Sequence, residues 1–141
     1  METTIMKLID HQKLAYISYV DKDGYPNTKA MLAPRKREGI KVFYFTTNTS
    51  SKKVQHFRKH KKASIYFCDK RFFRGVTLLG EIEVLEDQTS KEMIWQEEDT
   101  LYYPEGVNDP DYCVLKFTAK TGEYYTNFKV KEIDCINKGG L

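Results

Sequence analysis

Hydroxyl and ammonium side chains gather in one short segment of the sequence, between an apolar stretch and an amphipathic one. The segment begins at Phe45 and contains Thr46, Ser51, Lys52 and Lys53. The apolar residues before it predict a strand, and those after it have the three-residue spacing of a helix. The first N–H groups of a helix lack partners within the helix and attract anions, and lysines and hydroxyls donate hydrogen bonds to phosphate. The segment therefore predicts a phosphate site where a strand meets a helix.

A plainer interpretation fits the same residues. Thr49 or Ser50 could cap the helix by accepting a hydrogen bond from its first turn, with both lysines in solvent. Because such caps are common, the local pattern alone leaves both interpretations open.

Other chemistry has less support. His56 and His60 are four residues apart, which suits two metal ligands on one helical face. Basic residues around them would repel a cation; they are Arg58, Lys59, Lys61 and Lys62. The sequence contains neither the G-x-S-x-G turn of serine hydrolases nor the glycine-rich loops that hold nucleotides. We therefore predict no metal site, and the catalytic residues remain unknown.

The elements that position these groups belong to one small domain. The chain has 141 residues, of which 40% are hydrophobic, 30% charged and 13% aromatic. This composition excludes a disordered chain and a coiled coil, and the length suits a single domain over 1–141. No apolar stretch approaches the roughly 20 residues that cross a bilayer, and the N-terminus has no apolar signal core. The three cysteines fit no disulfide framework or zinc spacing. We expect a cytoplasmic protein with reduced thiols and no membrane partner.

Strand patterns dominate the chain. Runs rich in β-branched and aromatic residues predict strands over 14–20, 25–32, 40–46, 63–68, 72–85, 112–118 and 122–127. Helical patterns cover 4–9, 52–60 and 88–100, and a polar turn is expected at 35–39. Short strands with few helices favour a mainly β (α+β) antiparallel barrel over a parallel sheet.

The order of these features resembles the pyridoxamine 5'-phosphate oxidase-like FMN-binding split barrels, and among them the short bacterial general stress proteins. The matching features are a hairpin turn at 23–26, the strand-end Thr46, the pair Ser51-Lys52 before a helix, the strand at 63–67 and the acidic turn Asn108-Asp109-Pro110-Asp111. Their order across the chain, rather than any single motif, carries the resemblance.

The resemblance implies a six- to seven-stranded antiparallel split β-barrel with short flanking helices, which forms a homodimer and binds FMN at the subunit interface. The implied FMN contacts are Lys29, Ala30, Met31, Leu32, Phe45, Thr46, Ser51 and Lys52. Lys29 stands where arginine is usual, and it would place a cation near the flavin N1 and O2 atoms. Thr46, Ser51 and Lys52 would hold the phosphate, and Phe45 would lie next to Thr46 near the ribityl phosphate.

Departures from the family pattern narrow the implied function. Vitamin B6 oxidases carry a C-terminal Arg-Leu-His-Asp-Arg-like segment that binds the substrate phosphate, and residues 131–141 contain no such segment. Gly75 stands where many members have a flavin-contacting glutamine, and Tyr124-Tyr125 stands where stress proteins tend to have tryptophan. The resemblance thus implies a flavin-dependent oxidoreductase or a flavin-binding stress protein that is not a genuine vitamin B6 oxidase. Its substrate and electron donor stay open, and so does enzymatic turnover.

A different class of function fits the basic run at 52–62. Lysines with interleaved aromatic residues suit a small barrel that binds single-stranded nucleic acid. However, the formal net charge is only +3, and the aromatic residues fall at the strand spacing expected of a core. Nucleic-acid binding is therefore the alternative rather than the main prediction.

Overall fold

The computed structural model describes residues 1–136, which form eight strands, three α-helices and two short 3₁₀ helices. The strands are β1 (Leu14–Val20), β2 (Pro26–Leu32), β3 (Lys36–Glu38), β4 (Val42–Asn48), β5 (Lys62–Asp69), β6 (Arg74–Leu85), β7 (Tyr112–Thr126) and β8 (Lys129–Asp134). The helices are α1 (Glu2–His11), α2 (Lys52–Phe57), α3 (Gln88–Ile94), η1 (Glu97–Leu101) and η2 (Gly106–Asn108). Residues 137–141, which the predicted domain includes, lie outside the described part.

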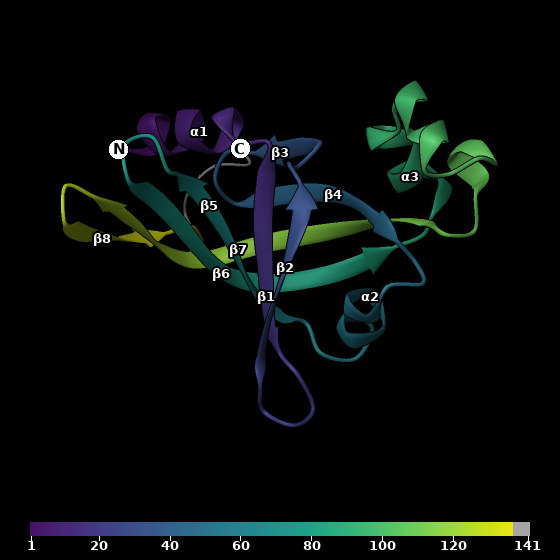
Figure 1. Cartoon of the computed structure of the whole chain (residues 1–141), viewed down its shortest axis with the longest axis horizontal. Helices are drawn as coiled ribbons and strands as arrows, with labels where there is room; N and C mark the ends of the chain where they lie inside the picture. The colour runs from purple at the N-terminus through teal and green to yellow at the C-terminus, as the bar shows by residue number, and fades with distance from the viewer. Residues whose placement is uncertain (137–141) are drawn as a thin grey trace.

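All the strands join one antiparallel sheet, in the order β2-β1-β5-β6-β7-β4-β3, with β8 added to β7. β2 and β4 contact each other although no strand ladder joins them. The sheet therefore curls into a split barrel, with α1 across one end and α2 beside the β1–β2 hairpin (Figure 1). The predicted fold class is confirmed, because the chain is mainly β and antiparallel with short flanking helices.

Three boundaries differ from the sequence prediction, and they raise the strand number from six or seven to eight. The expected turn at 35–39 contains β3, which pairs with β4 and is anchored by an ion pair of 2.6 Å between Arg37 and Asp10. The two strands predicted at 112–127 are one strand, β7, because Gly122 packs against β6 where a side chain would overlap the Thr77 carbonyl oxygen. β8, which was not predicted, extends the sheet beyond β7.

The predicted helix at 88–100 also breaks in two. α3 ends at Ile94, and η1 begins at Glu97. Asp99 accounts for the break, because its carboxylate accepts hydrogen bonds from the backbone N–H of Gln96 and from Arg35. α3, η1 and η2 together form a lobe beside the end of β4 (Figure 1).

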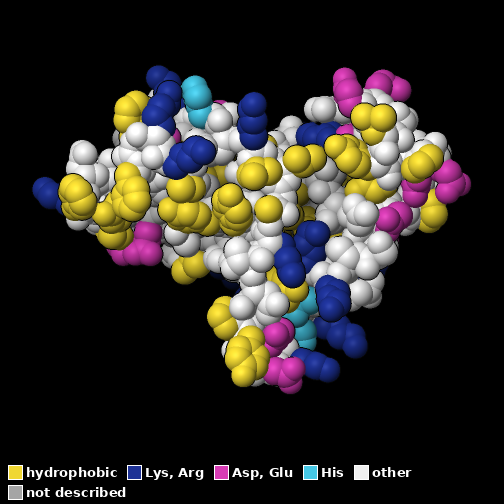
Figure 2. Space-filling view, viewed as in Figure 1, with side chains coloured by type: hydrophobic (Ala, Val, Ile, Leu, Met, Phe, Trp, Pro, Cys, Tyr) yellow, Lys and Arg dark blue, Asp and Glu magenta, His cyan; other side chains and the backbone are white. Residues whose placement is uncertain are grey.

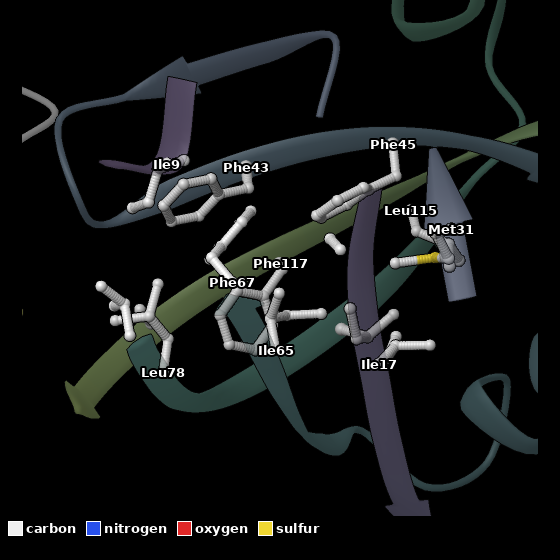
Figure 3. Close-up of a cluster of buried hydrophobic side chains, with 14 of the residues drawn as sticks. Ile9, Ile17, Met31, Phe43, Phe45, Ile65, Phe67, Leu78, Leu115 and Phe117 are labelled. Carbon is white, nitrogen blue, oxygen red and sulfur yellow. The ribbon is translucent and has the colours of Figure 1, made fainter. Parts of the chain in front are cut away.

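The core fills the barrel with aromatic and aliphatic side chains from opposite strands. Phe43 lies 5.8 Å from Phe67 and 6.3 Å from Phe117, measured between ring centroids. Figure 3 shows these rings between Leu78 at one end of the cluster and Met31 at the other. Each fully buried side chain of this size contributes about 1.5–3 kcal/mol, so the barrel holds β2 and β4 firmly where the predicted site lies. Within residues 1–136, no helix has the length and apolar character needed to cross a membrane.

Candidate functional site

The structure brings the predicted site residues together where the barrel is split. Lys29, Ala30, Met31 and Leu32 lie on β2, Phe45 and Thr46 lie on β4, and Ser51 and Lys52 lie at the start of α2. Because β2 and β4 are in contact and α2 follows β4 after three residues, the three segments border one region. We call this region the α2 cleft. Its residues of interest are Lys29, Ser51 and Lys53.

Strand alternation decides which of these side chains a ligand can reach. Met31 is 6% exposed and Phe45 is fully buried, and both belong to the core (Figure 3). A ligand could contact them only through the backbone. Lys29, Ala30 and Leu32 are exposed, and Thr46 is half-buried. The site therefore offers polar groups from α2 and β2 above an apolar floor from the core.

Asp111 holds the loop that leads into α2. Its carboxylate accepts hydrogen bonds from the backbone N–H of Ser50 at 2.8 Å and from the side-chain amide of Asn48 at 3.2 Å. Its backbone carbonyl accepts one from the N–H of Thr49 at 2.7 Å. The acidic turn at 108–111 thus positions the candidate site, a role that its place ahead of a strand did not reveal.

Two buried hydroxyls in this loop have no hydrogen-bond partner among residues 1–136. They are Thr49 Oγ1 and Ser51 Oγ. Thr49 lies beside the Cys113 thiol; burial raises the pKa of that thiol, and the Thr49 hydroxyl acts in the opposite direction. Ser51 is the N-cap residue of α2, yet its side chain makes no capping bond. An unsatisfied buried hydroxyl costs about 1–3 kcal/mol, so a group that accepts a hydrogen bond from Ser51 would offset a real penalty. Neither cap predicted from the sequence, Thr49 or Ser50, is the capping residue.

Lys53, rather than Lys52, is the partly buried cation of α2. Loss of hydration lowers the pKa of Lys53, nearby Lys29 lowers it further, and only Cys113 opposes the shift. Lys52 is exposed. The signal in the sequence is the position of Lys53 four residues before Phe57, because residues four apart share a helical face and Phe57 is 2% exposed.

The α2 cleft is therefore a region of uncompensated positive charge. Neither Lys29 nor Lys53 has an ion pair within the described residues, which contain six ion pairs elsewhere. Figure 2 shows Lys and Arg side chains between β2 and α2, against a neighbouring row of hydrophobic side chains. Two cations and a free hydroxyl beside the first N–H groups of a helix suit a phosphate.

Tyr66 explains why a residue without a side chain stands at position 75. A side chain there would overlap the phenol oxygen of Tyr66 on the adjacent strand. Burial raises the pKa of that phenol, and the Cys68 thiol adds to the rise. Tyr66 therefore takes the space above β6 that a larger residue at position 75 would fill.

The rings of His56 and His60 make contacts with other aromatic rings. Their rings lie 5.1 Å apart, and His56 stacks on Tyr19 at 4.3 Å. Within residues 1–136, no group of three or more His, Cys, Asp or Glu side chains is placed to hold a metal ion. The two histidines line a groove of about 1300 Å³ on the other side of α2, which includes none of the predicted site residues.

The fold is thus an antiparallel split barrel that carries unpaired lysines where β2, β4 and α2 meet. The chain belongs to the pyridoxamine 5'-phosphate oxidase like family, whose model matches residues 1–137. The resemblance drawn from the order of the motifs is thereby confirmed, and the nucleic-acid alternative is not favoured.

Solved structures agree with this assignment. A Clostridium acetobutylicum protein related to general stress protein 26 of B. subtilis (pyridoxinephosphate oxidase family) is 39% identical, with a TM-score of 0.87 over 94% of this chain and 92% of that one. The general stress FMN/FAD binding protein of Xanthomonas citri is 15% identical, with a TM-score of 0.76 over 89% of this chain and 88% of that one. At that identity the second likeness establishes the fold alone.

Curated relatives match a shorter region. The pyridoxine/pyridoxamine 5'-phosphate oxidase of Agrobacterium fabrum is 33% identical over 87 residues, which are 62% of this chain and 41% of the relative. The match thus spans less than half the length of that oxidase.

Proposed function

We propose that this protein binds FMN in the α2 cleft and acts as a flavin-binding protein of the general stress type. The observation that carries the proposal is the combination of an unpartnered buried hydroxyl, Ser51 Oγ, with the partly buried Lys53, whose pKa is lowered by burial and also by Lys29. These groups lack partners in the described chain, and a phosphate monoester would satisfy all of them. The flavin-binding relatives that share the fold support the choice of FMN.

In this arrangement the chain binds and orients the cofactor. Ser51 donates a hydrogen bond to the phosphate, Lys53 neutralises it from the partly buried side, and Lys52 adds charge from the solvent side. Asp111 fixes the loop backbone, so the groups are positioned before the ligand arrives. Lys29, on β2, supplies a cation for the negatively charged parts of the ligand. Bound FMN would supply redox chemistry, which makes a flavin-dependent oxidoreductase the reaction class.

We also propose that two copies associate through apolar side chains that the described chain leaves exposed. They include Leu32 on β2 at 52%, Phe73 in the β5–β6 turn at 73% and Phe128 in the β7–β8 turn at 90%. Hydrophobic side chains form a row across the visible face in Figure 2. Contiguous apolar surface of this kind is typical of an interface between proteins, and it adjoins the α2 cleft.

The visible absorption spectrum and a titration test the binding. Adding FMN to the purified protein should quench the flavin fluorescence and saturate at one FMN per chain. Riboflavin, which lacks the phosphate, should bind about 100-fold more weakly, because charged hydrogen bonds contribute about 1.5–3 kcal/mol each. Absence of quenching, or equal affinity for riboflavin, would refute the phosphate assignment. Sedimentation of the same samples tests the dimer, which should be present at micromolar concentration.

A further inference from the structure

The groove on the other side of α2 is a second concave region, separate from the α2 cleft. It has a volume of about 1300 Å³ and lies between the β1–β2 hairpin, the segment after α2, and the bulged part of β6 and β7. This exceeds the roughly 300–1,000 Å³ of ordinary small-molecule pockets. A bulge at Leu79 and Gly80 shapes one wall, and a side chain at Gly80 would overlap the Thr118 carbonyl oxygen.

The groove carries unpaired positive charge. Five lysines line it against two carboxylates; the lysines are Lys22, Lys59, Lys61, Lys62 and Lys120. Glu81 pairs with Lys120 at 3.2 Å, and Asp21 is engaged by the β1–β2 turn, where it accepts hydrogen bonds from the N–H groups of Asp23 and Tyr25. The other four lysines have no ion pair or side-chain hydrogen bond within residues 1–136. An anion with several charges would complement this surface.

A column of aromatic rings leads into the groove. Tyr19 is 8% exposed and stacks on His56 at 4.3 Å with an interplanar angle of 27°. His56 in turn lies 5.1 Å from His60 at 32°. His60 is exposed, lines the groove and ends the column. Apolar side chains lie close by, with Val20 at 60% and Leu79 at 49% exposed. A planar ring is therefore the shape that this end of the groove accommodates. Figure 2 shows histidine and lysine side chains together beside the β1–β2 hairpin.

We propose that this groove binds a nucleoside polyphosphate, with its base against His60 and its phosphates along Lys59, Lys61 and Lys62. A ring joined to two or more phosphates matches both halves of the groove, whereas inorganic anions would use only the lysines. Stacking on an aromatic side chain and charged hydrogen bonds to phosphate supply the affinity. The site is additional to the proposed FMN site and shares none of its residues.

Calorimetric titration with ADP on the full chain, loaded with FMN, tests the proposal. ADP should bind with one site per chain, and pyrophosphate and adenosine should each bind at least about tenfold more weakly, since each uses one half of the groove. The double variant Lys61→Glu/Lys62→Glu should lose at least about tenfold in ADP affinity. The matched control Lys129→Glu/Lys131→Glu changes the same charge on exposed residues of β8 and should leave it unchanged. His60→Ala should weaken ADP without changing pyrophosphate binding.

Each other outcome overturns a named part of the proposal. No binding with ADP at about 1 mM and low salt, which is the upper end of the usual range of substrate affinities, removes the site. Equal losses in both double variants would mean nonspecific charge attraction. Pyrophosphate as tight as ADP would remove the ring contact. Loss of ADP binding in Lys53→Met, or displacement of FMN by ADP, would place ADP in the α2 cleft. FMN fluorescence quenching, recorded on every variant, shows that the fold is intact.

Discussion

Two regions of this molecule bury charge, and they do so in opposite ways. In the lobe, Arg35 meets Asp99 in a two-pronged ion pair with distances of 2.6 and 2.9 Å, and the guanidinium also donates to the Ile94 carbonyl. In the α2 cleft, Lys53 is partly buried near Lys29 without an ion pair in the described chain. The charge in the first region is paired within the described chain, and the charge in the second is not.

The two regions differ in how their surroundings shift the pKa of the buried group. Burial alone would raise the pKa of Asp99, but hydrogen bonds from Arg35 and the Gln96 N–H outweigh it and hold that pKa below its usual value. The pKa of Lys53 is lowered, which favours the neutral amine, because burial is the largest cause and no carboxylate opposes it. A desolvated cation without a partner costs stability. In the proposed function, a bound phosphate would compensate the charge of Lys53 and accept a hydrogen bond from Ser51.

The largest expected effect comes from breaking the complete region. Asp99→Asn leaves the Arg35 charge buried and unpaired, since the two side chains are only 4% and 14% exposed. We expect a loss of about 3–5 kcal/mol in the free energy of unfolding, measured by urea denaturation. The matched control is Asp10→Asn, which breaks an ion pair of the same 2.6 Å length whose side chains are 52% and 26% exposed. It should cost about 0–1 kcal/mol. Similar losses in the two variants would show that burial of the Arg35–Asp99 pair adds nothing to its contribution to stability.

The same pair predicts the acid dependence of stability. The pKa of Asp99 is lower in the folded protein than the 3.8 of a free carboxyl, so its contribution is complete above that pH. It is lost as the pH falls through the lowered value, because the unfolded chain then binds the proton more tightly. The stability difference between the parent and Asp99→Asn should therefore narrow below about pH 4. A difference that stayed constant down to pH 2 would show that the carboxylate charge is not what stabilises the lobe.

Lys53→Met tests the incomplete region. It keeps the apolar stem and removes the desolvated charge. FMN affinity should fall about 10- to 100-fold, measured by fluorescence quenching, while the free energy of unfolding without flavin should not fall. Loss of both affinity and stability would mean that Lys53 is a structural residue. Loss of the Asp99 charge should therefore lower the free energy of unfolding, whereas loss of the Lys53 charge should lower only the affinity for FMN.

The sequence predicted the elements that border the candidate site better than the placement of individual side chains. The strand, the hydroxyl cluster and the helix at 45–57 follow from periodicity and composition, because the core imposes apolar spacing on each element. The choice between Lys52 and Lys53 depends on how a six-residue helix is rotated over β4, which packing decides. Likewise Asp111 reaches the loop across 61 residues of sequence, and local patterns carry no information about such a contact.

Element boundaries failed where tertiary contacts override local pattern. In the sequence, Asp99 is one of several carboxylates in a segment predicted to be helical. In the structure, its ion pair with Arg35 helps to break that helix. The sequence predicts that Gly122 begins a separate strand. In the structure, it allows β7 to continue without interruption close to β6. The predicted homodimer, FMN contacts and single domain over 1–141 stay predictions, since they depend on partners or on residues outside those described.

Ser51→Ala should change FMN affinity less than Lys53→Met does. Its control is the helix cap Asp87, elsewhere in the chain. An N-cap serine normally contributes about 0.5–2 kcal/mol to its helix, but the Ser51 side chain makes no capping bond. Because the substitution also removes a buried hydroxyl that has no partner, we expect the free energy of unfolding without flavin to rise by up to about 1–3 kcal/mol rather than fall, while FMN affinity falls roughly 2- to 10-fold. Asp87→Ala is the control, because Asp87 caps α3 by accepting a hydrogen bond from the Ser90 N–H at 3.0 Å. That variant should lose stability and keep FMN affinity. If Ser51→Ala behaved like Asp87→Ala, the free hydroxyl would be a cap after all.

Lys52→Ala has the smallest expected effect. It tests how much Lys52 contributes to FMN affinity compared with Lys53. Lys52 is adjacent to Lys53 but exposed, so water screens its attraction for a phosphate. We expect FMN affinity to fall about 2- to 5-fold at low salt and the loss to vanish at high salt. The loss caused by Lys53→Met should persist under the same salt, because partly buried charges are screened less. A larger, salt-resistant loss in Lys52→Ala would instead make Lys52 the principal phosphate ligand, and the partial burial of Lys53 would then have no functional meaning.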